Sequence, residues 1–275
     1  MEEKRRGRRD NFDKNKKQEN VTAENEERNK DLIIGRNAVS EALRSDRAID
    51  TLLVIRGERN GSVGRIIAEC KENGIVVQEV DKKKLDFMCP KGNHQGVVAW
   101  AAVHEYSTVE DIFALAEQRG EDPFIIICDE LEDPHNLGAI IRTAETSGAH
   151  GVIIPKRRNA SLSWAVGKSS AGAVEYVPVA RVGNLASTVE ELKKRGLWIY
   201  SADMDGQNWC ETDFKGPVGL VVGSEGFGVS RLIREKSDFI VSLPMKGKIT
   251  SLNASVAAGI LMYEVCRQRS GLKSK

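Results

Sequence analysis

Short apolar runs alternate with helical stretches along residues 122–270, and this pattern limits the chain to few folds. The runs are three to five residues long and show no regular alternation with polar residues, so neither face of these strands is expected to be exposed to solvent. Such runs, separated by helices, are typical of parallel strands that helices cover on both faces. We therefore expect an α/β domain with a parallel sheet, whose strands include residues 124–128, 152–154, 176–179, 197–200, 220–222 and 239–243.

A smaller unit precedes this domain. Apolar residues at 51–55, 75–77 and 97–103 predict strands, and apolar residues at helical spacing lie between them. The resulting division assigns 31–104 to a compact α/β unit, 105–121 to a linker and helix, and 122–270 to the larger domain. Residues 251–268 carry small and apolar side chains on most faces, which predicts a buried final helix.

Residues 1–30 form a charged tail with few apolar side chains. Positions 1–17 contain eight Lys or Arg residues against four Asp or Glu residues, and acidic residues follow. Too little apolar surface is available to offset the entropy of ordering, so this tail is expected to be disordered. Contact with phosphates and simple solvation are both open roles for it.

The composition favours a cytoplasmic protein. No apolar run approaches the roughly 18 residues that span a bilayer, and the charged start is not a secretory signal. Five scattered cysteines without a C-x-x-C pair argue against a disulfide framework. The four histidines share no ligand spacing with a cysteine, so no metal site is expected.

Three loops that follow predicted strands carry polar side chains, at the positions where open parallel sheets bind ligands. The first begins a helix, with Asn136 as its expected N-cap and Arg142 nearly two turns further on. The second is a glycine-rich turn that holds Glu225, and the third contains Ser251 and Asn253. Taken singly, an ordinary cap, a tight turn and a solvated arginine would explain these residues equally well.

Basic residues gather at the same end of the predicted sheet. Lys156 and Arg157 follow one strand, and further lysines follow the last one. Positive charge beside strand ends suits a phosphate backbone, although solvated loop lysines are the commoner case.

The three loops together are far more specific than any one of them. The sequence reads NLGAIIRTA at 136–144, LVVGSEGFG at 220–228 and LPMKGKITSLNASVAAG at 243–259. This ordered set resembles the three motifs of the SpoU (TrmH-type) RNA ribose 2'-O-methyltransferases of the SPOUT superfamily, and most of all their RlmB-like branch. GRNAVSEAL at 35–43 and NHQGVVA at 93–99 are similar to the L30e-like RNA-binding domain of that family.

The resemblance, which covers residues 32–269, implies both a fold and an activity. It implies a C-terminal trefoil knot in the parallel-sheet domain, homodimers formed through that domain, and methylation of a guanosine ribose in large-subunit ribosomal RNA. The implied cofactor is S-adenosylmethionine, with contacts from Gly223, Leu243, Met245 and Leu252. The implied catalytic and substrate-positioning residues are Asn136, Arg142, Glu225, Ser251 and Asn253.

Arg142 is the group expected nearest to the ribose hydroxyl. Because a guanidinium has a pKa above about 12, it is a poor general base, and electrostatic stabilisation is physically easier. In the first unit Arg36, His94 and Gln95 lie in polar loops beside glycines and are candidates to hold RNA.

Two alternatives stay open at this point. One is methylation of transfer RNA or of another ribosomal position, because the first unit carries few local signals for a particular nucleotide. The other is a non-catalytic RNA-binding assembly factor, which would have no reason to retain all the motif residues.

Overall fold

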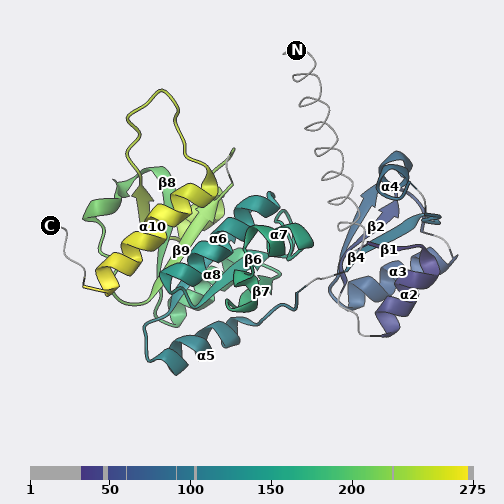
Figure 1. Ribbon diagram of the computed structural model, residues 1–275, viewed down its shortest axis with the longest axis horizontal. Coiled ribbons are helices and arrows are strands. Elements are labelled where there is room, and N and C mark those ends of the chain that lie inside the picture. Colours follow the sequence, from purple (N-terminus) through teal and green to yellow (C-terminus); the bar gives the residue numbers. More distant parts are fainter. Residues whose placement is uncertain are drawn as a thin grey trace, which may run out of the picture. The chain divides into compact units, whose positions relative to one another are not determined.

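The computed structural model describes residues 32–45, 49–59, 61–90, 92–101, 104–224 and 226–271. The predicted disorder of residues 1–30 and the predicted role of Glu225 fall on residues outside these ranges. The chain divides into two compact units, Met1–Val103 and His104–Lys275, and each is described by itself (Figure 1). Within the described ranges no helix is long and apolar enough to cross a membrane.

The described part of the first unit is built on a four-stranded sheet. Its strands, in spatial order, are β1 (Leu32–Ile34), β4 (Val97–Ala101), β2 (Ile49–Ile55) and β3 (Val76–Val80). Only the β2–β3 pair is parallel. Helices α2 (Arg36–Arg44) and α3 (Gly61–Glu72) pack on one face, whereas α4 (Lys82–Met88) packs on the other through the fully buried Leu85.

The second unit contains a six-stranded sheet, all of it parallel. In spatial order its strands are β10 (Phe239–Ser242), β8 (Trp198–Asn208), β9 (Val218–Gly223), β5 (Phe124–Asp129), β6 (Gly151–Pro155) and β7 (Val179–Val182). The α/β class and the parallel sheet expected from the apolar runs are therefore confirmed.

Helices cover both faces of this sheet (Figure 1). One face is covered by α6 (Pro134–Ser147), α7 (Trp164–Ser169) and α10 (Ala254–Arg269). The other is covered by α5 (Val109–Arg119), α8 (Leu185–Lys194) and α9 (Arg231–Lys236). Two short 3-10 helices, η1 (Ala173–Glu175) and η2 (Trp209–Glu211), lie in the connections.

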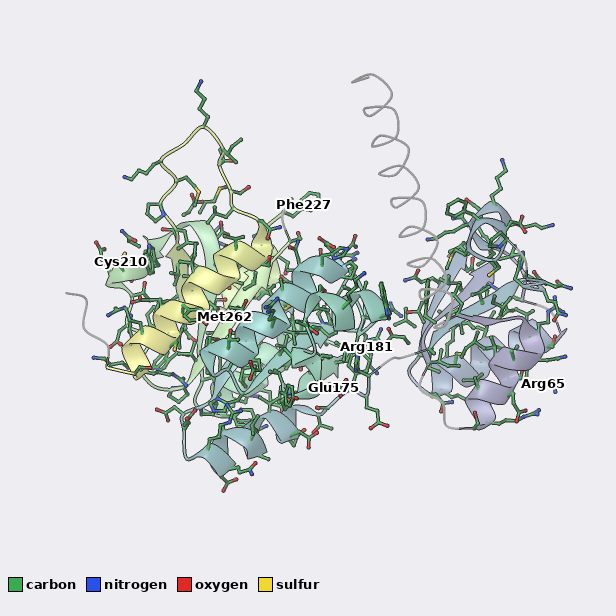
Figure 2. The ribbon with its side chains drawn as sticks, viewed as in Figure 1. Arg65, Glu175, Arg181, Cys210, Phe227 and Met262 are labelled. Atoms are coloured by element: carbon green, nitrogen blue, oxygen red, sulfur yellow. The ribbon has the colours of Figure 1, made fainter. Side chains whose placement is uncertain are left out.

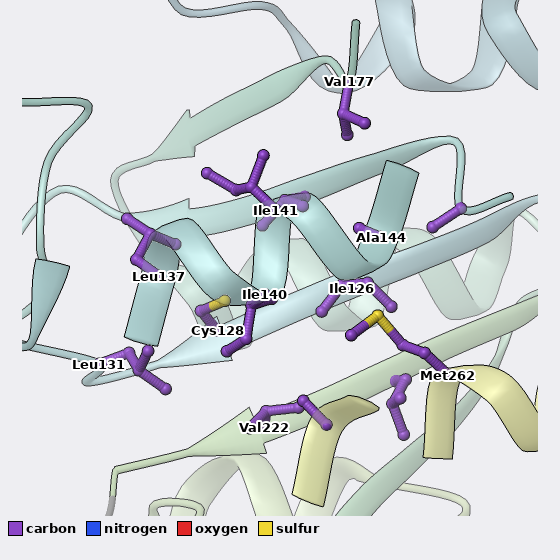
Figure 3. Packing of buried hydrophobic residues seen from close by; sticks show 14 of the residues in the cluster. Ile126, Cys128, Leu131, Leu137, Ile140, Ile141, Ala144, Val177, Val222 and Met262 are labelled. Atoms are coloured by element: carbon purple, nitrogen blue, oxygen red, sulfur yellow. The ribbon is translucent and has the colours of Figure 1, made fainter. Parts of the chain in front are cut away.

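Each face of the sheet has its own hydrophobic core, and successive side chains of β5 point alternately into one core and the other. Ile126 and Cys128 point toward Ile140 of α6 and Met262 of α10 (Figure 3), and all four side chains are fully buried. Ile127 belongs to the core on the opposite face. Each buried aliphatic side chain contributes about 1.5–3 kcal/mol, which explains why an unbroken apolar run is needed at a strand with two covered faces.

The strand predicted at 176–179 is wrong. The helix η1 occupies the preceding residues, Tyr176 is 74% exposed, and β7 begins only at Val179. Gly172 has a φ of 85°, so the chain turns there rather than extending. A short apolar run does not by itself distinguish a strand from a buried turn of helix.

A buried histidine lies at the amino ends of the central strands. The His150 ring is fully buried, its Nδ1 accepts a hydrogen bond from the Phe124 N–H at 2.9 Å, and its Nε2 lies 3.1 Å from the Glu121 carboxylate. Because Nδ1 is the acceptor, the neutral ring carries its proton on Nε2 and donates it to Glu121. Burial, assisted by Arg119 and Arg269, lowers the pKa of His150 despite the opposing effect of Glu121.

The lowered pKa of His150 predicts a loss of stability in mild acid. The unfolded chain takes up a proton near pH 6.5 that the folded chain binds only at lower pH, so the free energy of unfolding should fall as the pH drops below about 6.5. Urea unfolding at pH 5.0–7.5 measures this slope. In the control variant His150→Asn an amide oxygen can replace Nδ1 as acceptor without titrating, and the slope should be smaller; equal slopes would contradict the assignment.

Candidate functional site

The carboxyl ends of β5, β8, β9 and β10 lie at one edge of the sheet, because these neighbouring strands are all parallel. Helices α6 and α10 begin beside this edge (Figure 1), and α10 packs on α6 and β9. The three motifs found in the sequence follow β5, β9 and β10. The fold therefore brings the loop after β5 together with a loop more than a hundred residues later in the chain, after β10.

A hydrogen bond between two asparagines joins the first motif to the third. Asn253 Nδ2 donates to Asn136 Oδ1 at 2.9 Å, and the Asn136 side chain is buried, with 5% of the residue exposed. Asn253 is also the N-cap of α10, since its Oδ1 accepts from the N–H groups of Ser255 and Val256 at 3.0 and 3.3 Å. One side chain thus fixes both the start of α10 and the position of Asn136.

The expectation that Asn136 caps α6 is wrong. The N-cap is Asp133, whose carboxylate accepts from the His135 N–H at 2.9 Å, and Pro134 occupies the first helical position. Asn136 lies within the first turn of α6, and its side chain is directed to Asn253. Likewise α10 begins after Asn253 rather than after Ser251.

Replacing Asn253 by alanine should lower the free energy of unfolding by about 2 kcal/mol. The substitution removes an N-cap, which costs about 1 kcal/mol, and takes one partner from a buried amide, which costs about 1–3 kcal/mol. Urea unfolding measures the change. Ser251→Ala is the matched control, because Ser251 is exposed in the same loop, and its effect should stay within about 0.5 kcal/mol. Equal midpoints for Asn253→Ala and wild type would contradict the structural role.

Gly223, a predicted cofactor contact, ends β9 and begins a closed turn. Ser224 N–H donates to Gly228 O at 3.1 Å and Gly228 N–H donates to Ser224 O at 2.8 Å. A Cβ on Gly223 would overlap the backbone of Gly228, so only glycine permits this turn. Phe227 projects from the turn with 93% of its surface exposed (Figure 2).

Asp129 is a site residue that the sequence reading missed. It ends β5, lies opposite Gly223 in the β5–β9 pair, and is 4% exposed. Its Oδ2 accepts from the Ser230 N–H at 2.7 Å, just after the glycine turn, so it links the first two motif loops. A carboxylate at the end of a buried strand was the available signal, but nothing local indicated its partner.

The loop between β10 and α10 extends away from the rest of the unit (Figure 1). Residues 244–253 are exposed, and residues 243–252 make no backbone hydrogen bond to another described residue. Leu243 packs on the core, whereas Met245 and Leu252 are each 36% exposed and Ile249 is 75% exposed. Apolar side chains beside unpaired backbone groups are suited to a flat heterocycle with polar edges.

Arg142 lies on α6 but not on its buried face. Its side chain is exposed, and it forms no ion pair with any other residue in the described ranges. Six residues separate it from Asn136, so the two side chains leave the helix in different directions. Within one chain the structure therefore brings Asn136 and Asn253 together, and leaves the Arg142 guanidinium available to an anion.

Basic side chains follow β6 at the same edge of the sheet. Asn159 Oδ1 accepts from the Leu131 N–H at 2.8 Å, which ties this loop to the loop after β5. Arg158 pairs with Glu130 at 2.9 Å, and this contact raises the pKa of Arg158. Arg157 is exposed and Lys156 is half-buried.

In the first unit the three predicted RNA-binding residues lie around one loop. Arg36 Nε donates to Gln95 O at 2.8 Å, and its Nη2 lies 2.5 Å from Glu58 Oε1. His94 is buried, with Nδ1 accepting from the Gly96 N–H at 3.0 Å and Nε2 2.9 Å from Asp86 Oδ1. Arg36 and His94 therefore order the loop, and exposed Gln95, with a φ of 50°, is the residue that it presents to solvent.

Among the described residues, no group of three or more His, Cys, Asp or Glu side chains is arranged to hold a metal ion. The polar residues of the site are instead amides, a hydroxyl, a carboxylate and a guanidinium. Such groups can orient a substrate and stabilise charge.

Comparison with known proteins agrees with this geometry. Residues 123–263 match the SpoU rRNA Methylase family, and residues 32–107 match the substrate-binding domain of RNA 2'-O ribose methyltransferases. The Bacillus subtilis protein YacO, whose name assigns it to the TrmH family of tRNA/rRNA methyltransferases, is 52% identical over 241 residues, covering 87% of this chain and 96% of YacO.

Two solved structures with S-adenosylmethionine (AdoMet) bound are also similar. The SpoU methyltransferase AviRb from Streptomyces viridochromogenes is 25% identical, with a TM-score of 0.55 and coverage of 87% of this chain and 90% of AviRb. An rRNA methyltransferase from Sinorhizobium meliloti is 26% identical, with a TM-score of 0.54 and coverage of 88% of each chain. By its sequence and its fold, the chain belongs to the SpoU rRNA methylase family of RNA methyltransferases.

Proposed function

We propose that this protein transfers a methyl group from S-adenosylmethionine to the 2'-oxygen of a guanosine ribose in large-subunit ribosomal RNA. The observation that carries the proposal is the Asn253–Asn136 hydrogen bond, which joins two motif loops at the strand ends, beside the exposed loop at 243–253. Membership of an RNA methyltransferase family supports the reaction class, and the ribosomal guanosine is the finer part of the proposal.

The loops at the strand ends have the chemistry that the cofactor requires. The unpaired backbone groups of 243–252 can bind the edge of the adenine, and Leu243, Met245 and Leu252 can pack against its faces. The backbone of Gly228 fills the place of a Cβ on Gly223, so only glycine allows this closed turn at the strand end. When bound, S-adenosylmethionine supplies a methyl group that its sulfonium already activates.

The remaining catalytic work is alignment and charge stabilisation. Asn136, Ser251 and Asn253 orient the ribose and the cofactor, and Glu225 belongs to the same proposed set. The bound cofactor would supply its methyl group to the 2'-oxygen, and the hydroxyl proton would leave to solvent or to a phosphate oxygen. Arg142, which stays protonated, stabilises the developing negative charge and the neighbouring phosphate rather than taking the proton.

The first unit is proposed to bind the RNA substrate. The proposed domains are residues 31–104 for RNA binding, residues 105–121 as a linker and helix, and residues 122–270 for methyl transfer. Gln95 is exposed on its ordered loop, and Lys156 and Arg157 supply positive charge in the catalytic unit. Phosphate contacts of this kind position RNA without selecting its sequence.

A homodimer and a trefoil knot complete the proposal. Val256 and Tyr263 are 50% and 51% exposed on the outer face of α10, with Ile260 between them, which supports burial of this face against a second copy. The chain forms β10 at the edge of the sheet and then returns to pack α10 on α6 and β9. This return supports a knot, in which the last helix passes through a loop of the chain.

The test is transfer of radiolabelled methyl from S-adenosylmethionine to unmodified ribosomal RNA and, in parallel, to unmodified transfer RNA, followed by hydrolysis in alkali. Because a 2'-O-methyl group blocks attack on the adjacent phosphate, the label should be recovered in an uncleaved dinucleotide with guanosine on its 5' side. Label on a free mononucleotide would place the methyl on a base and overturn the proposal. Label on transfer RNA alone would favour that substrate, and no label on any RNA would favour a non-catalytic assembly factor.

A further inference from the structure

One large side chain of the first unit is exposed on helix α4. Phe87 of α4 is 86% exposed, and it is the only strongly exposed large hydrophobic residue among the described residues of that unit. Leu85, two residues earlier, is fully buried and attaches α4 to the sheet. Phe87 is therefore not held in the core, and its ring is accessible to a ligand.

Lysines surround this phenylalanine. Lys82, Lys83 and Lys84 are all exposed, and Lys83 and Lys84 lie four and three residues before Phe87, on the same face of the helix. The nearby acids are already paired, since Asp81 lies 4.0 Å from Arg56 and Asp86 lies 2.9 Å from His94. The face around Phe87 is therefore positively charged.

Helix α4 is connected to the loop that presents Gln95. Asp86 precedes Phe87 and holds the His94 ring, which in turn precedes Gln95 and accepts the Gly96 N–H. This pair fixes α4 against the loop. The helix that carries Phe87 and the loop that presents Gln95 are thus held together in the first unit.

We infer that Phe87 is a stacking platform for an unpaired base of the substrate RNA, with Lys83 and Lys84 bound to the flanking phosphates. The inference rests on the proposed function and specifies which part of the RNA this unit recognises: a single-stranded loop or bulge rather than a duplex. Unpaired bases stack on exposed aromatic rings, whereas the bases of an RNA helix are not available to such a ring.

Charge and surface composition favour RNA over a protein partner. Protein interfaces are depleted in lysine and are centred on clustered apolar residues, whereas here one ring shares its helix face with two lysines. A lone aromatic residue flanked by cations matches one base flanked by phosphates.

The test measures binding of the full-length protein to a 12-nucleotide RNA that contains 2-aminopurine, both single-stranded and annealed to its complement. The wild type should bind the single strand more tightly, and stacking should quench the 2-aminopurine fluorescence. Phe87→Ala should weaken single-strand binding about 10-fold and abolish the quenching, whereas Phe87→Trp should preserve both. Tyr176→Ala, which removes another exposed ring, from the second unit, is the matched control and should behave as wild type.

Salt dependence separates stacking from charge. Phe87→Ala should leave the slope of log affinity against log salt unchanged, whereas Lys83→Ala combined with Lys84→Ala should make it shallower by about 1.4. Wild-type affinity and quenching in Phe87→Ala, or no preference of the wild type for the single strand, would overturn the inference. The methyl-transfer assay stays independent: transfer that does not depend on Phe87 refutes only this inference, and quenching without transfer refutes only the proposed activity.

Discussion

Replacing Arg142 by alanine should reduce kcat for methyl transfer at least about 100-fold while the melting temperature changes by less than a few degrees. The side chain is exposed and forms no ion pair with the described residues, so its loss removes no packing and leaves no buried charge. Loss of one positioned group that stabilises developing charge typically costs 10²–10³ in kcat. Single-turnover transfer to ribosomal RNA, together with a thermal unfolding curve, measures both quantities.

Two further variants sharpen this experiment. Arg142→Lys retains the positive charge but lacks the planar pair of donors, so partial activity is expected if Arg142 stabilises charge. Arg119→Ala removes an exposed arginine that precedes β5, at the opposite end of the strands from the motif loops, and should leave kcat unchanged. An Arg142→Ala protein that keeps most of its kcat would remove Arg142 from the proposed catalytic set.

The sequence predicted the second unit best where local pattern and tertiary environment agree. The apolar runs at 124–128 and 220–222 lie within β5 and β9, which are buried on both faces, and both were predicted as parallel strands. The run at 176–179 has the same composition, but part of it forms an exposed turn after Gly172. Burial of a three- or four-residue run depends on its neighbours in space, which local composition does not contain.

The site shows the same division between local and long-range information. The Asp133–Pro134 pair is a local signal for the start of a helix, and it was available in the sequence although Asn136 was predicted as the cap. The Asn136–Asn253 bond and the contact of Asp129 with Ser230 join residues more than a hundred positions apart. No periodicity or spacing encodes such pairs, and only the strand order brings them together.

Gly138 of the first motif gives the last and largest stability prediction. Gly138 lies two residues after Asn136, and its close neighbour is helix α7. A Cβ on Gly138 would overlap Ser169 Oγ and lie 2.9 Å from the Val166 carbonyl oxygen. Ser169 is held there by hydrogen bonds to Ala165 O at 2.7 Å and Pro134 O at 3.2 Å. Gly138 is therefore required for α6 and α7 to pack.

Gly138→Ala should lower the free energy of unfolding by about 3 kcal/mol, because overpacking at a helix contact outweighs the better helix propensity of alanine. For a unit of this size that corresponds to a fall in melting temperature of about 6–12 °C. Gly259→Ala is the matched control: a Cβ there meets only Thr143 Cγ2 at 3.8 Å, so this helical glycine should tolerate alanine without loss. Adding Ser169→Gly to Gly138→Ala removes the Oγ and Cβ contacts and should restore part of the stability. If the double variant is no more stable than Gly138→Ala alone, the contact with Ser169 is not the cause, and the carbonyl of Val166 must set the limit instead.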